Sequence, residues 1–278
     1  MADELTRRGH IVTVCDIHGS RYLDPEKQYI DIVNILDEED VNEHVSRNNV
    51  VYNFAGLADL DESSNKPIKT IESNVLGNTI ILEACRKHKI KRYVFASTVY
   101  VHSNTGSFYR ISKLASELII KNFQKEYGLE YTILRYGSLY GPRCQDNNFI
   151  YKTLKEALLY KKITRSGDGE EIREYIHVRD ASHLSVDILD ERFKNQCINI
   201  TGNEQIKIKD LFKMIKEILD KDIKIEYKKS DVSHHYGITP YKFDALLPDT
   251  GKKLTSNFYH DFGQGLIELL CEIKGEEK

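Results

Sequence analysis

Tyr109 and Lys113 are two side chains whose types and spacing could together do acid–base chemistry. Their separation of four residues places the phenol and the ammonium one turn apart on the same face of a helix. A neighbouring ammonium favours the phenolate, which lowers the pKa of a tyrosine toward neutral pH. Such a tyrosine could take the proton of a hydroxyl group while a hydride leaves the same carbon. By itself, the pair is weak evidence, because helices carry such pairs by chance and two solvated side chains on a polar face are the default interpretation.

The residues on both sides of this pair predict a parallel sheet covered by helices. Short runs of β-branched and apolar residues alternate with longer amphipathic stretches, as in repeated strand–helix–strand units. We expect strands at 10–16, 50–54, 92–96 and 131–134, and helices at about 37–48, 68–88 and 109–127. The strands are short and continuously apolar, as strands buried on both faces are. The sequence therefore predicts an α/β fold that positions Tyr109 just after a strand.

The composition is that of an ordinary globular protein, with 278 residues, 30% charged and 40% hydrophobic. The net charge of −3 and the lack of a basic tract argue against a nucleic-acid partner. No apolar run reaches membrane-spanning length, so we expect no membrane partner. The five cysteines are scattered and form no C-x-x-C pair, which predicts reduced thiols in the cytoplasm. Neither they nor the ten histidines show the spacing of a metal site.

The first residues predict the second half of a helix that Gly9 ends, followed directly by the strand that finishes at Asp16. A dinucleotide-binding fold should show a strand and a glycine-rich turn before that helix, because the turn seats the pyrophosphate at the helix N-terminus. Neither is present in the sequence. The Gly167-Asp-Gly169 segment stands in the wrong context for that role.

Five further segments accompany the pair in order along the chain. They are Asp16, Asn53-Phe-Ala-Gly56, Phe95-Ala-Ser-Thr98, Leu134-Arg-Tyr-Gly-Ser-Leu-Tyr-Gly-Pro-Arg143 and the stretch 167–180. From residue 2 to about 266, the chain resembles the extended short-chain dehydrogenase/reductases, specifically the NAD-dependent epimerase/dehydratase family that includes the UDP-glucose 4-epimerases.

The resemblance implies a Rossmann-type, doubly wound parallel sheet in residues 1–142 and a smaller, partly intertwined α/β substrate-binding lobe in residues 143–278. It also implies that the first strand and the glycine-rich loop are missing, for which a misassigned start or a truncated sequence is the expected explanation.

The same resemblance implies NAD as the cofactor. Asp16 would hold the adenosine ribose hydroxyls, and its charge would repel a 2′-phosphate. Asp31 and Ile32 would contact the adenine, and small residues after Asn53 would let the backbone approach the cofactor closely. Structural roles stay open for several of these residues: a capping aspartate, a surface turn or a buried amide. The implied cofactor-binding residues are Asp16, Asp31, Ile32, Phe54, Ala55, Gly56, Asn74, Tyr109, Lys113 and Tyr136.

Thr98 would complete a catalytic set with Tyr109 and Lys113 by hydrogen bonding the reacting sugar oxygen. Ser97 is the alternative, because the connection 99–108 is shorter than the family's usual loop. Lys113 would also bond the nicotinamide ribose, and Glu117 is interpreted only as its neighbour on the helix.

Two residues of the later motifs would bind the substrate. Arg173 would clamp the diphosphate of a nucleotide sugar through two parallel hydrogen bonds. Ser138 stands where the family usually has an asparagine that contacts the substrate phosphate. His177, in the same motif as Arg173, is interpreted as a structural hydrogen-bonding residue in preference to a catalyst.

The reaction implied is transient oxidation of a nucleotide sugar, with epimerisation at C4 of a UDP-hexose as the simplest outcome. Val99 and Tyr100 occupy the positions of the acidic pair that a 4,6-dehydratase needs, and Asp16 argues against an NADPH-dependent reductase. A non-catalytic nucleotide-binding relative is an alternative, because the phosphate-binding loop is absent, and so is another nucleotide-sugar oxidoreductase of the family. The resemblance further implies a homodimer that packs through the helices at 68–88 and 109–127.

Overall fold

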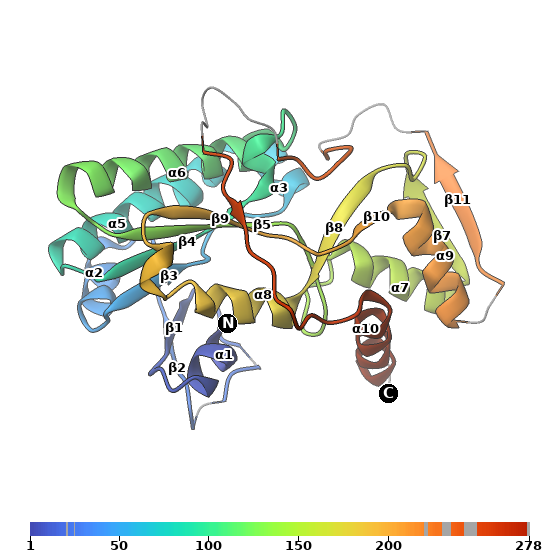
Figure 1. Cartoon of the computed structure of the whole chain (residues 1–278), viewed down its shortest axis with the longest axis horizontal. Helices are drawn as coiled ribbons and strands as arrows, with labels where there is room; N and C mark the ends of the chain where they lie inside the picture. Colours follow the sequence, from blue (N-terminus) through green and yellow to red (C-terminus); the bar gives the residue numbers. More distant parts are fainter. Residues whose placement is uncertain (21, 25, 220–221, 230–234, 242–248, 277–278) are drawn as a thin grey trace.

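A five-stranded parallel sheet forms the centre of the larger part of the molecule (Figure 1). The computed structural model describes all residues except 21, 25, 220–221, 230–234, 242–248 and 277–278. The sheet order is β12 (Lys252–Lys253), β9 (Gln196–Ile200), β5 (Tyr131–Tyr136), β4 (Arg92–Thr98) and β3 (Val50–Asn53). The predicted strands at 50–54, 92–96 and 131–134 are confirmed, and each pair in the sheet is parallel.

Helices cover both faces of this sheet, because successive side chains of a strand point to opposite sides. Tyr93 and Phe95 of β4 pack on one face against α2 (Glu38–Ser46), α5 (Gly77–Lys87) and α6 (Ser107–Tyr127). Val94 packs on the other face against α8 (Val178–Asp187). Both faces are therefore dry, which explains the continuous apolar runs in the sequence and confirms the predicted doubly wound α/β fold.

The predicted helix at 68–88 is divided into three parts. These are α4 (Pro67–Ile71), a π-helical turn η1 (Glu72–Leu76) and α5, and they follow α3 (Leu60–Asn65). Single π turns inside helices frequently occur at functional sites. Here the turn carries Asn74, whose side chain is buried.

The first 32 residues form a unit beside the large sheet. Helix α1 (Ala2–Arg7) ends near Gly9, whose φ of +85° suits a helix stop, as predicted. Strands β1 (Thr13–Asp16) and β2 (Tyr29–Ile32) make a separate two-stranded parallel sheet. An ion pair between Arg8 and Asp187, with 2.6 Å from NH1 to Oδ1, fastens α1 to α8. Within the described residues, β3 pairs with β4 alone. The free edge of β3 therefore forms no strand pairing with β1 or β2.

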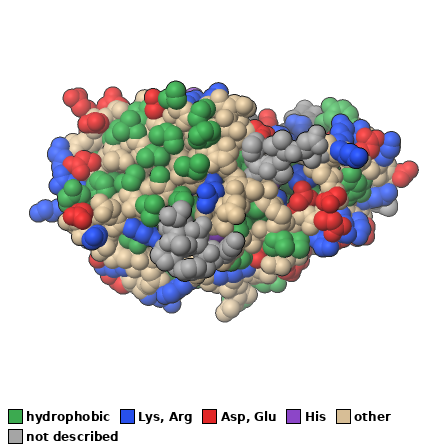
Figure 2. Space-filling model, turned by 90° about the horizontal axis from the view of Figure 1, so that it is seen from above, with side chains coloured by type: hydrophobic (Ala, Val, Ile, Leu, Met, Phe, Trp, Pro, Cys, Tyr) green, Lys and Arg blue, Asp and Glu red, His purple; other side chains and the backbone are tan. Residues whose placement is uncertain are grey.

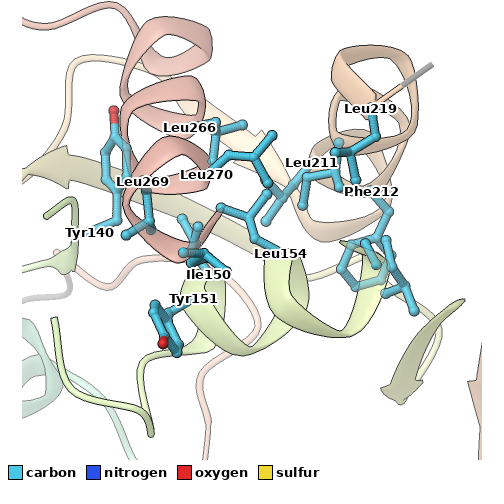
Figure 3. Close-up of a cluster of buried hydrophobic side chains, with 14 of the residues drawn as sticks. Tyr140, Ile150, Tyr151, Leu154, Leu211, Phe212, Leu219, Leu266, Leu269 and Leu270 are labelled. Carbon is cyan, nitrogen blue, oxygen red and sulfur yellow. The ribbon is translucent and has the colours of Figure 1, made fainter. Parts of the chain in front are cut away.

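The second half of the chain builds a lobe around its own apolar core (Figure 3). A three-stranded sheet combines β6 (Ser138–Tyr140), β8 (Ile172–His177) and β10 (Gln205–Lys207), and a two-stranded sheet combines β7 (Lys162–Ser166) and β11 (Lys224–Lys228). Helices α7 (Phe149–Tyr160), α9 (Ile208–Leu219) and α10 (Phe262–Glu276) contribute Leu154, Leu211 and Leu266 to the core. Two short 3₁₀ helices complete the fold, η2 (Val99–His102) and η3 (Glu191–Phe193).

Strands β9 and β12 and helix α8 come from residues after 142, yet they pack in the larger part of the molecule. The chain thus returns to the large sheet after entering the smaller lobe. A division at residue 142 stays a prediction. None of the helices in the described ranges has the length and apolarity needed to cross a membrane.

Candidate active site

The carboxyl ends of β3, β4 and β5 and the start of α6 bring the predicted catalytic residues together. Thr98 is the last residue of β4, and in the register of the sheet it lies beside Tyr136, the last residue of β5. The hydroxyl groups of Thr98 and Tyr109 form a hydrogen bond. Lys113, one turn further along α6, is buried and donates from Nζ to the carbonyl oxygen of Ala96 at 2.8 Å. All three side chains therefore face the same strand end.

The protonation states differ from the sequence-based expectation that Lys113 lowers the pKa of Tyr109. Burial raises the pKa of Tyr109 to about 12, and the hydrogen bond with Thr98 only partly opposes this effect. Burial also lowers the pKa of Lys113 to about 8, against the attraction of Glu117. The expectation is wrong for this structure because Nζ of Lys113 turns to the Ala96 carbonyl and lies 4.7 Å from the centre of the Phe95 ring. Desolvation then dominates both groups.

A buried ion pair lies behind these residues, and the sequence analysis missed it. Both carboxylate oxygens of Glu117 accept from Arg135, at 3.0 Å from Nε and 2.7 Å from NH2. Ser97 donates to the same carboxylate at 2.6 Å. NH1 of Arg135 also lies 3.0 Å from Nε2 of His102. Glu117 is thus more than a helix neighbour of Lys113, since it ties α6 to the ends of β4 and β5.

A second buried group, Asn74, fixes the loop after β3 against α6. Its side chain accepts from the backbone N–H of Leu57 at 2.6 Å and donates to the Leu57 carbonyl at 3.0 Å and to Ser112 Oγ at 2.9 Å. Gly56, in this loop, has a φ of +141°. A Cβ at Gly56 would lie 2.5 Å from Oδ1 of Asn74 and 3.9 Å from Nζ of Lys113. The backbone at Gly56 therefore passes closer to Asn74 than a larger residue would allow, and Lys113 lies at ordinary contact distance beyond it.

An aromatic row connects this centre to the smaller lobe. Tyr100 of η2 lies edge-on to Tyr109 with ring centres 6.3 Å apart and packs on Tyr236 at 4.6 Å. The guanidinium of Arg173 lies 4.2 Å from the centre of the Tyr236 ring. Arg173 is buried, and its NH1 donates to the Ile172 carbonyl at 3.1 Å. Both of these contacts are with neutral groups, and within the described ranges Arg173 forms no ion pair.

The other predicted residues occupy three places. Phe54 is half exposed between the rings of Tyr52 and Tyr136, next to Ala55, whose N–H donates to Asn53. Ser138 begins β6, opposite Tyr175 of β8, the strand that carries Arg173. Asp16, Asp31 and Ile32 lie at the carboxyl ends of β1 and β2. The structure does not bring these last three onto the five-stranded sheet that holds Thr98.

His177 has a structural role in this arrangement. Its Nδ1 accepts from the backbone N–H of Arg179 at 3.3 Å and so caps the start of α8. Burial, with the neighbouring His260, lowers the pKa of His177 to about 4. A search of the described residues finds no group of three or more His, Cys, Asp or Glu that could hold a metal ion.

The residues around Lys113 fit the nicotinamide-ribose half of NAD. The backbone of Gly56 lies next to Lys113, since even a Cβ there would be 3.9 Å from Nζ, and the ammonium of Lys113 can donate to ribose hydroxyls. For the pyrophosphate, the fit is incomplete, because no turn with repeated glycines leads into a helix within the described part of the chain.

A Rossmann-type sheet with a Thr–Tyr–Lys cluster at its carboxyl edge defines an oxidoreductase-like site on a nucleotide-binding fold. The chain belongs to the NAD dependent epimerase/dehydratase family, whose sequence model matches residues 1–201. This membership confirms the predicted enzyme class and NAD as the cofactor.

Curated relatives of this chain act on nucleotide sugars. A UDP-N-acetyl-alpha-D-glucosaminuronate decarboxylase of Bacillus cytotoxicus is 28% identical, over 97% of this chain and 92% of the relative. A putative UDP-glucose 4-epimerase of Methanocaldococcus jannaschii is also 28% identical, over 78% of this chain and 77% of the relative. Among solved structures, a UDP-glucose 4-epimerase of Thermotoga maritima with UDP-glucose superimposes with a TM-score of 0.84 and 24% identity, covering 99% of this chain and 94% of its own. At that identity, the superposition shows the fold alone.

Proposed function

We propose that this protein is a nucleotide-sugar epimerase that inverts C4 of a UDP-hexose through transient oxidation. The observation that carries the proposal is the hydrogen-bonded pair of Thr98 and Tyr109 beside the buried Lys113. The Methanocaldococcus jannaschii relative, named a putative UDP-glucose 4-epimerase, supports the same activity.

In this mechanism, bound NAD supplies the hydride acceptor. Tyr109 is protonated at rest, because burial raises its pKa. Tyr109 must therefore first release its own proton to solvent, and the ammonium of Lys113 stabilises the phenolate that forms. This phenolate then takes the proton of the C4 hydroxyl while Thr98 holds the sugar oxygen. The keto intermediate then turns so that its other face receives the hydride. Return of the hydride to C4 on that face and of the proton to the C4 oxygen gives the inverted alcohol.

Arg173 is the proposed anchor for the diphosphate of the substrate. Its guanidinium is buried, rests on Tyr236 and contacts neutral groups, so a diphosphate would supply the missing negative charge. Ser138, which begins a strand of the same small sheet, is proposed to contact the substrate phosphate. The sugar would then span the row of aromatic rings between Arg173 and Tyr109.

The cofactor would extend from Lys113 toward the two-stranded sheet of β1 and β2. Gly56, Asn74 and Tyr136 would border its nicotinamide end, together with Phe54 and Ala55. Asp16, Asp31 and Ile32 are proposed to hold its adenosine end, where they lie at the ends of β1 and β2.

We further propose a homodimer that forms through the exposed apolar side chains of α4, η1 and α6. The space-filling view shows hydrophobic side chains gathered on this face of the molecule (Figure 2). The exposed residues are Ile68, Ile71, Leu76, Phe108, Ile111 and Leu118. The cytoplasm is the proposed location, because all five cysteines are free thiols.

Decarboxylation of a UDP-linked uronic acid is a second candidate. The decarboxylase of Bacillus cytotoxicus aligns with 97% of this chain, more than the putative epimerase does. Both reactions would begin with the same oxidation at C4, so the site around Tyr109 serves either.

The test is to incubate the protein with NAD and, in turn, UDP-glucose, UDP-N-acetylglucosamine and UDP-glucuronate, and to follow the sugars by NMR. Inversion at C4 supports the first proposal, and release of carbon dioxide with a UDP-pentose supports the second. If calorimetry detects NAD binding while no sugar changes, both are wrong. Failure to bind NAD would favour the non-catalytic relative. Tyr160→Phe, at the exposed end of α7, is the matched control for Tyr109→Phe.

A further inference from the structure

A cavity of about 580 Å³ lies at the amino ends of β3, β4 and β5, the end of the large sheet opposite the candidate active site. Its lining includes Val50 and Arg92, which begin β3 and β4, and Glu130, which directly precedes β5. Thr98 ends the seven-residue strand β4. At about 3.3 Å per residue, the cavity therefore lies roughly 20 Å from Thr98. Its volume is typical of small-molecule sites, which occupy about 300–1,000 Å³.

Apolar residues from several elements form part of the cavity wall. They are Val50, Cys85, Ile90, Leu129 and Leu189. Tyr127, at the end of α6, also lines the cavity, and its side chain is 57% exposed. The guanidinium of Arg86 lies 5.0 Å from the centre of the Tyr127 ring. The wall thus offers a ligand an apolar surface and an exposed aromatic ring.

Cationic side chains outnumber acidic ones in the same lining. The cations are Arg86, Lys89, Lys91, Arg92 and Lys194, and the carboxylates are Glu130 and Glu191. Both carboxylates already pair with Lys194. Within the described ranges, Lys89 and Lys91 form no ion pair. The cavity therefore carries an excess of positive charge, which favours an anionic ligand.

The end of a helix does not account for these cations. Basic residues commonly follow a helix because they can bond its last carbonyl groups. At the end of α5, the backbone does so, since His88 N–H donates to the Ala84 carbonyl and Ile90 N–H donates to the Cys85 carbonyl, each at 3.0 Å. Lys89 has a φ of +53°, a left-handed conformation that glycine would adopt without strain. The helix end thus gives no reason for a lysine at position 89.

Arg92 provides an independent indication of an anion. Its side chain is only 5% exposed, and NH1 donates to Thr132 Oγ1 at 3.1 Å and to the Ile188 carbonyl at 3.4 Å. Its Nε is buried and has no hydrogen-bond partner in the part of the chain that the structure describes. Its NH2 lies 3.6 Å from a carboxylate oxygen of Glu191, which is beyond hydrogen-bond distance. A buried guanidinium whose donors are incompletely bonded gains most from an anion.

We propose that this cavity binds an aromatic organic phosphate of about the size of a mononucleotide. The phosphate would bond Lys89, Lys91 and NH2 of Arg92, because a compact dianion matches several unpaired cations. The aromatic group would cover the exposed ring of Tyr127. The site would operate at the opposite end of the sheet from Tyr109, so the inference does not depend on the proposed reaction.

The test measures the occupancy of this cavity directly. The full chain is acetylated briefly with increasing UMP, AMP or inorganic phosphate, and mass spectrometry follows the modification of each lysine. We expect UMP or AMP to protect Lys89 and Lys91 at lower concentrations than inorganic phosphate does, and less effectively at higher salt. Lys87, which lies on α5 outside the lining, should react at an unchanged rate.

Variants of the exposed lysines test the same site by affinity. Lys91→Gln should weaken protection of Lys89 by about tenfold, as loss of one hydrogen bond to a charged group does, and Lys89→Gln should weaken protection of Lys91 equally. The matched control, Lys87→Gln, should leave both unchanged. Circular dichroism would show that all three variants are folded.

Three results would overturn the inference. The first is that neither nucleotide protects Lys89 or Lys91 at millimolar concentration. The second is that inorganic phosphate protects them as well as the nucleotides do, which would remove the aromatic group from the proposal. The third is that Lys87→Gln weakens protection as much as Lys91→Gln, which would indicate attraction to the surface charge in place of a site. Nucleotides bound near Arg173 would not protect these lysines, because they lie at the other end of the sheet.

Discussion

Replacement of Glu117 by glutamine tests the buried ion pair that supports the site. The change removes the charge that faces Arg135 but keeps the size and shape of the side chain. Glu117 accepts three hydrogen bonds, two from Arg135 and one from Ser97, and both members of the ion pair are completely buried. The substitution therefore leaves a guanidinium without its counter-ion in a dry environment.

The expected cost follows from that burial. Removal of one partner from a buried ion pair typically costs about 3–5 kcal/mol, because the remaining charge is desolvated and unpaired. We expect the free energy of unfolding, measured by urea denaturation, to fall by about this amount. The matched control is Glu43→Gln, which breaks the exposed pair with Arg47 on α2. An exposed pair contributes about 0–1 kcal/mol, so this control should have little effect.

A second variant separates lost attraction from the penalty of the unpaired charge. Glu117→Leu combined with Arg135→Met replaces both ions by apolar groups, and such replacements are often neutral or stabilising. The double variant should therefore be more stable than Glu117→Gln alone. If Glu117→Gln costs less than about 1 kcal/mol, as an exposed pair does, the reasoning from burial is refuted.

Three further predictions concern the site and its surroundings. Tyr109→Phe should lower kcat by about 10²–10⁴ while NAD affinity, measured by calorimetry, stays unchanged; a variant with near wild-type turnover would remove Tyr109 from the mechanism. Gly56→Ala should weaken NAD binding and destabilise the fold by about 1–3 kcal/mol, because its φ is +141° and its Cβ would meet Asn74; unchanged affinity and stability would contradict the close approach. His177 has a folded-state pKa of about 4 against an ordinary 6.5, so the unfolded state binds more protons between these values and stability falls as the pH drops from 6.5 to 4. His177→Asn keeps a capping group for α8 and should flatten this loss, of at most about 3 kcal/mol, in urea titrations at several pH values, whereas His183→Gln at an exposed site should not.

The sequence predicted those parts of the site that local structure determines. Tyr109 and Lys113 share a helix face because of their spacing, and Thr98 ends a strand whose apolar run is legible in the sequence. The pairs Glu117–Arg135 and Tyr100–His235 join residues 18 and 135 positions apart, so no periodicity could reveal them. The separation of β1 and β2 from the large sheet is likewise a property of strand pairing, which apolar runs alone do not specify.

The error about the pKa of Tyr109 has the same origin. Helical spacing shows only that the Lys113 ammonium can lie on the same face as the Tyr109 phenol. Burial determines which groups that ammonium contacts. Lys113 has lost most of its water, so its charge is held by the Ala96 carbonyl and the Phe95 ring, with Glu117 behind it. Glu117 in turn is neutralised by Arg135. A phenolate at Tyr109, one turn away on α6, would therefore attract the ammonium of Lys113, and the proton that Tyr109 exchanges with a sugar would change which groups that ammonium contacts.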